Sequence, residues 1–278
     1  MPAPGELTYY ERIGPEGREH VLNKPFSDES RGARLMEVGA VLLLLPQPPA
    51  RVLECGCGAG WLSYMLAKSG YDVVGQDVSA QAIELARNNP MFHALQKPPM
   101  FTSSDFEELP FESEFDAAVF FDSLHHSINM PLAIRQVFRA LKPGGLMIAS
   151  EPGVGHAQAM SEFSRTWDIT DKDAPPKLIL KLGREAGFLA GQVYPHTEWL
   201  GPRLYDRRPG LWGRSSEWSA QGCISSGPIA AESHSWSSRA SRWKFAAKKI
   251  RHVIGVPRIF ASRLGKNALA ARAADQRR

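Results

Sequence analysis

The stretch Val52-Leu53-Glu54-Cys55-Gly56-Cys57-Gly58-Ala59-Gly60-Trp61-Leu62 decides the fold of this chain. It begins within an apolar segment, residues 51–55, that predicts a β-strand, and it runs into residues 61–68, which predict a helix. Between them every second residue is glycine, the residue that lets a backbone turn with positive φ and approach a ligand closely. The free N–H groups and the positive dipole at the start of the helix favour a ligand that carries a carboxylate or a phosphate.

The spacing of the three glycines separates two kinds of nucleotide site. A dinucleotide-binding loop has the pattern Gly-x-Gly-x-x-Gly, whose last glycine lets the helix and the strand pack closely. Here the third glycine, Gly60, comes one residue early, and Trp61 takes the place of that last glycine. The acidic Glu54 also lies at the end of the strand. The pattern strand-Glu-x-Gly-x-Gly-x-Gly resembles motif I of the class I S-adenosylmethionine (SAM)-dependent methyltransferases.

The composition is globular, but the charge is unevenly distributed. The 278 residues are 43% hydrophobic and 22% charged, with a formal net charge of +4. Residues 1–201 contain 17 Lys and Arg against 25 Asp and Glu, whereas residues 202–278 contain 16 against 4. A chain of this length can bury a full core. We expect a leader or lid over residues 1–28, a SAM-binding methyltransferase domain over residues 29–200, and a basic, Trp-containing extension over residues 201–278.

Features of secreted and membrane-spanning proteins are missing from the sequence. Three cysteines do not make a disulfide framework, and Cys55 and Cys57 flank a glycine, where they can hardly converge on one metal ion. The first 18 residues lack the apolar core of a secretory signal. The longest apolar run, Val38–Leu45, is far shorter than the ~20 residues of a spanning helix. We therefore expect a reduced, cytoplasmic protein.

Further apolar segments predict strands that alternate with helices. The predicted strands are residues 51–55, 72–76, 99–102, 115–121 and 146–150, and the predicted helices are residues 30–45, 61–68, 80–89 and 131–141. A later helix that ends at Gly187 and a strand over residues 188–194 complete the domain. Crossovers of this length imply a doubly wound, mostly parallel α/β sheet with helices on both faces. Ligands bind such sheets beyond the carboxyl ends of the strands.

Polar residues follow several of these strands. Asp77 ends the second strand, placed to accept hydrogen bonds from a ribose diol. The alternative is that Asp77 or Ser79 caps the next helix. Asp105 and Phe106 follow the third strand, and the phrase Leu-Lys-Pro-Gly-Gly at residues 141–145 precedes the fifth.

Taken together, residues 51–151 resemble the SAM-binding core of a class I methyltransferase of the small-molecule branch. The resemblance implies the Rossmann-like methyltransferase fold and SAM as the cofactor. It implies that the glycines support the methionine part, that Asp77 holds the ribose, and that Asp105 and Phe106 hold the adenine. The implied cofactor-binding residues are Glu54, Gly56, Gly58, Gly60, Asp77, Val78, Asp105, Phe106 and Asp122.

The resemblance does not identify the methyl acceptor, so the candidate bases follow from their positions. Methyl transfer from a sulfonium requires alignment and, for a hydroxyl acceptor, removal of one proton. We expect this role for His125, His156 or Glu151, near the ends of the fourth and fifth strands, whereas His126 is expected to brace its loop. The Asn/Asp-Pro-Pro-Tyr signature of amino-methylating enzymes is absent after the fourth strand, which disfavours nucleic-acid bases and protein amides. No spacing requires a metal ion, and we expect none.

The basic C-terminal extension has its own pattern, which predicts a partly helical segment from about residue 237. Its apolar residues at helical spacing are Trp243, Ala246, Ala247, Ile250, Val253 and Ile254, with lysines and Arg251 between them. Three interpretations stay open: a helix docked on the domain, an anchor on an anionic membrane surface, and a contact with nucleic acid. The last is less favoured, because no interleaved aromatic residues or known module accompany the charge.

The sequence therefore predicts a SAM-dependent methyltransferase, an O-methyltransferase that acts on the hydroxyl of a small-molecule or carbohydrate-like acceptor. We extend this acceptor class to lipid-linked molecules presented at the cytoplasmic membrane face, because the extension is basic. Two alternatives remain. One is a SAM-binding scaffold without catalytic activity, and the other is an RNA methyltransferase that uses the basic extension to bind RNA.

Overall fold

Seven strands form one sheet in the computed structural model, which describes residues 1–195 and 251–257. Their order across the sheet is β3-β2-β1-β4-β5-β7-β6. The strands are β1 (Arg51–Cys55), β2 (Asp72–Asp77), β3 (Met100–Ser103), β4 (Phe115–Phe121), β5 (Leu141–Pro152), β6 (Gln192–Pro195) and β7 (Arg251–Pro257). Strands β1 to β5 are parallel, which confirms the predicted fold class. Strand β7 runs antiparallel to both β5 and β6.

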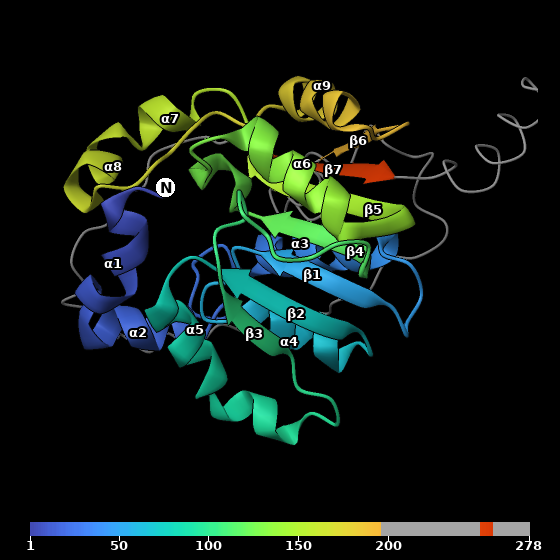
Figure 1. Ribbon diagram of the computed structural model, residues 1–278. Helices are drawn as coiled ribbons and strands as arrows, with labels where there is room; N and C mark the ends of the chain where they lie inside the picture. The colour runs from blue at the N-terminus through green and yellow to red at the C-terminus, as the bar shows by residue number, and fades with distance from the viewer. Residues whose placement is uncertain (196–250, 258–278) are drawn as a thin grey trace, which may run out of the picture.

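Helices cover both faces of this sheet (Figure 1). They are α1 (Pro4–Arg12), α2 (Gly14–Leu22), α3 (Arg31–Leu44), α4 (Trp61–Lys68), α5 (Ala80–Arg87), α6 (Met130–Ala140), α7 (His156–Ala159), α8 (Ser161–Trp167) and α9 (Pro176–Ala186), with 3-10 turns η1 (Pro90–Ala94) and η2 (Leu124–His126). Helices α3 and α4 pack on one face, and α6 and α9 pack on the other. None of the helices within the described ranges has the length and apolarity needed to cross a membrane.

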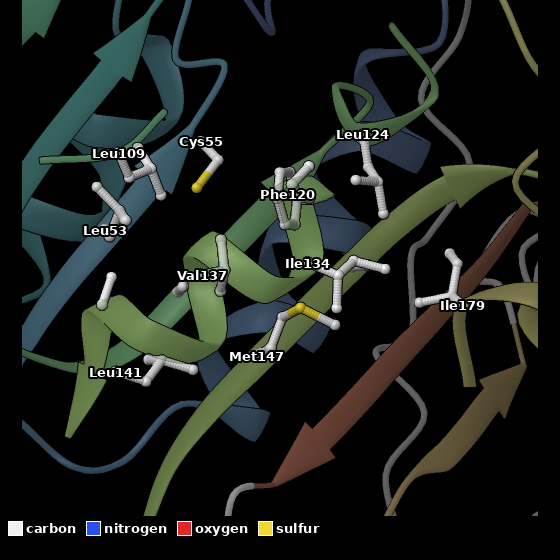
Figure 2. Close-up of a cluster of buried hydrophobic side chains, with 14 of the residues drawn as sticks. Leu53, Cys55, Leu109, Phe120, Leu124, Ile134, Val137, Leu141, Met147 and Ile179 are labelled. Carbon is white, nitrogen blue, oxygen red and sulfur yellow. The ribbon is translucent and has the colours of Figure 1, made fainter. Parts of the chain in front are cut away.

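Two hydrophobic cores lie on the two faces, because successive strand residues point to opposite sides. In β1, Val52 belongs to the core under α3 and α4, and Leu53 belongs to the core under α6 and α9. In β4, Val119 and Phe120 divide in the same way. Figure 2 shows the second core, in which Phe120 lies near Ile134 of α6 and Leu53 lies beside Leu109. A sheet covered on both faces explains why its strands are almost continuously apolar.

Short polar signals set the ends of the helices. The Ser79 hydroxyl accepts a hydrogen bond from Ala82 N at 3.3 Å and caps α5. Helix α9 ends at Gly187, whose φ of 111° suits the left-handed C-cap. Since Ser79 caps α5, the carboxylate of Asp77 is not needed for that role.

The segment over residues 1–28, expected as a leader or lid, contains the two helices α1 and α2. Gly5 lies so close to α8 that a Cβ there would be 1.9 Å from the Trp167 carbonyl oxygen, and Gly5 N donates to Asp168 O at 2.8 Å. The guanidinium of Arg12 donates to the carbonyls of Trp167 and Thr166 at 2.9 and 3.0 Å. These contacts join segments about 160 residues apart, so they are invisible in the local sequence.

The C-terminal prediction was wrong where the structure describes it. Val253 and Ile254, expected on a helix, lie in β7, which forms hydrogen-bonded ladders with β5 and β6. The remainder of the expected helix, residues 237–250, lies outside the described residues, as do most of the residues of the C-terminal extension. Strand pairing on both sides outweighs the helical spacing of two apolar residues.

The core on the α6 face supports a stability prediction. Phe120 is 0% exposed, whereas Phe26 is 61% exposed. We expect Phe120→Ala to lower the free energy of unfolding by about 3–5 kcal/mol, because it leaves a cavity in a packed core. The matched variant Phe26→Ala is expected to change it by less than about 0.5 kcal/mol. Urea denaturation measures both, and equal losses would contradict the assignment of this core.

Candidate active site

A cavity of about 270 Å³ lies at the carboxyl ends of the parallel strands. It opens where β1 and β4 lie side by side, the point at which the strand order reverses. The strand-end residues on its wall are Gly56, Gly58, Asp77, Val78, Asp105, Phe106 and Asp122. Figure 1 shows α1 and α8 side by side beyond this end of the sheet. The structure thus brings together most of the expected cofactor-binding residues.

The glycine loop after β1 requires its glycines for conformation and for space. Gly56 and Gly58 have φ values of 75° and 54°. A Cβ on Gly56 would lie 2.5 Å from Cβ of Ser123, and one on Gly58 would lie 2.4 Å from the Tyr10 hydroxyl. Gly60 also has positive φ, but it faces the ring of Phe101 and not the cavity. The loop therefore presents bare main chain at Gly56 and Gly58.

Asp77 links the glycine loop to the start of α5. Its Oδ2 accepts from Gly58 N at 2.8 Å, and its Oδ1 accepts from Ser79 N at 2.9 Å. Burial raises the pKa of Asp77, and these two N–H groups act against that rise. A carboxylate has about four acceptor positions, so two remain for a ligand in the cavity.

The other acidic residues on this side are also held by the protein. Asp105 accepts from Glu107 N at 2.8 Å, and Phe106 beside it packs edge-on against Phe120. Asp122 has a φ of 53° and accepts from Arg34 at 2.5 Å. Both carboxylates reach the cavity wall in fixed orientations.

Glu54 lies beneath the loop, away from the wall. It is 2% exposed and accepts a hydrogen bond from the Ser63 hydroxyl of α4. Burial raises the pKa of Glu54 to about 8, although the Ser63 hydrogen bond lowers it. The expectation that Glu54 touches the cofactor is not supported by this placement, because its side chain is enclosed between β1 and α4.

Glu151 fastens the loop that follows β4. Its Oε1 accepts from Ser123 N at 3.0 Å and from Leu124 N at 2.8 Å, and its Oε2 accepts from His125 N at 3.3 Å and contacts His125 Nδ1 at 2.7 Å. Burial, followed by the charge of Asp122, raises the pKa of Glu151 to about 7. Burial also lowers the pKa of His125 well below its ordinary value, so the neutral imidazole donates from Nδ1. The carboxylate caps η2 and holds this ring.

His156 belongs to the same buried network. Its Nε2 contacts Asp171 Oδ1 at 2.9 Å, and the same oxygen lies 3.6 Å from His125 Nε2. The Ser164 hydroxyl donates to the other oxygen of Asp171 at 2.7 Å. These contacts fix the segment after α8 against the loop that carries η2.

The three expected bases are therefore not at the cavity. His125 and His156 are 4% exposed and Glu151 is 1% exposed, and within the described part of the chain the wall includes none of them. The physical reason is that each satisfies a partner inside the fold. Of the described residues, His126 is the imidazole that reaches the wall, although the sequence suggested for it only a bracing role.

The hydrogen-bonding contacts of His126 involve its Nδ1, and its ring lies against the ring of His125, with centroids 4.0 Å apart. Its Nδ1 lies 2.6 Å from the Thr170 carbonyl oxygen and 3.4 Å from Glu6 Oε1. Since a carbonyl only accepts, Nδ1 carries a proton, and Nε2 is the nitrogen that can gain or lose one. Burial alone would lower the pKa of His126, but the contact with Glu6 and the charges around it raise the pKa to about 9. Both partners are distant in sequence, so no local signal could identify this histidine.

One group of described residues has the spacing of metal ligands. Ligand atoms of His125, His126 and Asp171 lie within 4.8 Å of one another. Each of these side chains already has a protein partner, namely Glu151, Thr170 and His156 respectively. The contacts are accounted for as a hydrogen-bond network, and the expectation of no metal ion stays a prediction.

Comparison with protein families gives a match that extends over more than half of the chain. A family model described as a methyltransferase domain matches residues 28–179. A malonyl-[acyl-carrier protein] O-methyltransferase of Erwinia pyrifoliae is 31% identical over 145 residues, which are 52% of this chain and 50% of the relative. A ubiquinone/menaquinone biosynthesis C-methyltransferase of Cellvibrio japonicus is 26% identical over 66% of this chain and 70% of its own length. The chain thus spans about half of the first relative and more of the second.

Solved structures show the same fold. Phosphoethanolamine N-methyltransferase 2 of Haemonchus contortus, in complex with S-adenosyl-L-methionine, superposes with a TM-score of 0.59 at 18% identity, over 77% of this chain and 52% of that one. A SAM-dependent methyltransferase of Thermotoga maritima has a TM-score of 0.55 at 18% identity, over 91% and 99%. The names of these relatives include transfer to oxygen, carbon and nitrogen, so they do not share one acceptor atom.

The buried Glu54 generates a prediction about stability and pH. Its pKa of about 8 in the folded protein lies above the ~4.3 of a free glutamate, so the folded state binds the extra proton between these values. Stability is therefore lost as the pH rises through this interval. We expect the difference in unfolding free energy between Glu54→Gln and the wild type to grow in favour of the variant from pH 5 to pH 9. Denaturant titrations across this range measure it, with the exposed Glu108→Gln as the control that stays flat.

Proposed function

The chain belongs to the class I SAM-dependent methyltransferases, and from this premise we propose that it transfers the methyl group of SAM to the hydroxyl of a small molecule, with His126 as the general base. The observation that carries the proposal is the position of His126. Its imidazole stands on the cavity wall with Nδ1 bound by the Thr170 carbonyl, so Nε2 is left to accept a proton. Nδ1 bound to a fixed acceptor is the arrangement that orients a catalytic histidine.

The residues of the site fit SAM. When bound, SAM supplies an electrophilic methyl group on a sulfonium. The bare main chain of Gly56 and Gly58 would let the amino-acid part of SAM approach closely, and the Tyr10 side chain, whose hydroxyl lies over Gly58, would have to move aside. Asp77 has acceptor positions for the ribose, and Asp105 and Phe106 border the space for the adenine. The carboxylates on this side also complement the positive charge of the cofactor.

Glu6 is a positioning residue for His126. One of its oxygens accepts from Thr170 N at 2.9 Å and lies 3.4 Å from His126 Nδ1. It thereby fixes both the imidazole and the segment whose carbonyl the imidazole binds. Its negative charge favours the protonated ring, so His126 is a strong base that is free to act only at alkaline pH or after Glu6 moves away.

A hydroxyl acceptor follows from the need for such a base. A hydroxyl nucleophile must lose a proton on methylation, and a positioned base accelerates this step by about 10²–10⁴-fold. Asp122, a carboxylate on the same wall, is a weaker candidate for the base because it is bound to Arg34. The relatives include an O-methyltransferase as well as C- and N-methyltransferases, so the choice of a hydroxyl rests on His126 and not on the relatives.

The first test concerns the cofactor. We expect Asp77→Asn to weaken the binding of S-adenosylhomocysteine at least tenfold in calorimetry, because the amide loses charge and acceptor positions. Asp72→Asn, at the other end of β2, is the matched control and should bind as the wild type does. Equal affinities of all three proteins for S-adenosylhomocysteine would show that Asp77 does not bind the cofactor.

The second test concerns the base. With labelled SAM and a panel of hydroxyl acceptors, we expect His126→Gln to lower kcat by about 10²–10⁴-fold with unchanged binding of S-adenosylhomocysteine. A scaffold without catalytic activity would show no methyl transfer in either protein.

The third test uses the pH profile. The unprotonated base is required, so kcat/KM of the wild type should rise with pH up to the His126 pKa of about 9. Glu6 raises this pKa, so Glu6→Gln should move the rise to lower pH. Glu16→Gln, on the exposed side of α2, should leave the profile in place. A profile that does not move with Glu6→Gln would contradict the pairing of Glu6 and His126.

A further inference from the structure

The cavity has two chemically different halves. The half described above consists of the glycine loop and the strand ends, where carboxylates gather. The other half comes from segments beyond the strand ends: the N-terminus with α1, the residues after η2, and α8 with the loop that follows it. The apolar and aromatic residues that this half contributes to the wall are Pro2, Tyr9, Ile128, Phe163 and Ile169. The two halves therefore suit ligands of different polarity.

Three of these apolar residues lie close in sequence to the proposed base or to its partners. Ile128 comes two residues after His126, and Ile169 directly precedes Thr170, whose carbonyl holds the imidazole at 2.6 Å. Tyr9 lies three residues after Glu6 on α1, so the two side chains share one face of the helix. A hydroxyl acceptor that reaches His126 would therefore enter a cavity whose wall also carries these apolar side chains.

Two carboxylates on the wall near His126 already accept hydrogen bonds from backbone N–H groups of the protein. Glu6 accepts from Thr170 N at 2.9 Å, and Glu107 Oε1 accepts from Asn129 N at 2.6 Å. A sugar presents hydroxyls all around its ring, and each of them needs a donor or an acceptor when it is buried. The Ser123 and Ser127 hydroxyls on the same wall donate to the carbonyls of Cys55 and Leu124 at 2.6 and 2.8 Å, so they are not free donors for a sugar. A carbohydrate-like body, which the sequence suggested, would therefore be poorly satisfied here.

The side chain of Ile128 is partly exposed to solvent. It is 44% exposed although it borders the cavity, so its apolar surface stays in contact with water until a ligand covers it. Covering apolar surface is favourable by roughly 25 cal/mol per Å². An acceptor with an apolar body would gain this energy, and a polar acceptor would not.

We propose that the acceptor is a small molecule with an apolar, aromatic or alkyl, body and a hydroxyl at one end, and that Ile128, Phe163 and Ile169 form the surface that binds this body. The inference rests on the proposed function, because it names the acceptor class of the same site. The hydroxyl points to His126, and the body lies between α8 and the residues after η2.

A homologous series tests the proposal. The probes are 4-methylphenol, 4-ethylphenol, 4-propylphenol and 4-butylphenol, with methyl glucoside as the carbohydrate probe. Binding to the complex with S-adenosylhomocysteine is measured by calorimetry, and turnover is measured with labelled SAM. We expect the affinity and kcat/KM to rise about fourfold per added methylene, through KM and not kcat. Methyl glucoside should neither bind nor react at the same concentrations.

Variants identify the surface. Ile128→Ser and Phe163→Ala should flatten the dependence on chain length, while the binding of S-adenosylhomocysteine stays unchanged. Leu189→Ser is the control: Leu189 is 59% exposed and is not part of the cavity wall, so the wild-type dependence should remain.

The outcomes separate this inference from the proposed function. If methyl glucoside is methylated and alkyl length has no effect, the proposed function stands and the apolar acceptor is overturned. If the phenols bind with the expected length dependence but no hydroxyl is methylated, the apolar surface stands and the proposed O-methylation fails. If no phenol binds to the complex with S-adenosylhomocysteine, the apolar surface is overturned whatever the turnover.

Discussion

The carboxylate of Glu151 at the end of β5 is the interaction on which the site depends. By accepting three successive backbone N–H groups and contacting His125 Nδ1, it fixes the chain where it leaves β4. With one ring held inward, the following residue, His126, is directed to the cavity and meets the Thr170 carbonyl. Glu151, which the sequence indicated as a catalytic base, thus braces the loop. His126, which was expected to brace the loop, lies at the cavity.

The central part of the fold could be predicted because its signals are local. Alternating glycines, continuous apolar strands and the Lys-Pro-Gly-Gly phrase each report a backbone requirement within a few residues. The predicted strand at residues 51–55 and the predicted helix at residues 61–68 coincide with β1 and α4. Asp77, Asp105 and Asp122 could be placed at one edge because parallel strands end together.

The rest could not be predicted because it depends on contacts between distant segments. Two adjacent histidines are equivalent in the sequence, and only Glu151, Thr170 and Glu6 distinguish them. Helix α1 contains Gly5, which is a poor helix former, yet the helix packs on α8 through that glycine. In β7, Val253 and Ile254 fit a helical spacing as well as a strand, and the partners on both sides decide between the two.

The position of β7 has a consequence for synthesis on the ribosome. Strand β6 joins the described sheet through β7, and β7 pairs with β5, which ends at Pro152. Residues 251–257 leave the ribosome about a hundred residues after β5. At translation rates of about 5–20 residues per second, the nascent five-stranded sheet has an unpaired border for roughly 5 to 20 seconds. An open strand border is a template for association with other chains, so the border of β5 is exposed to such pairing during this interval.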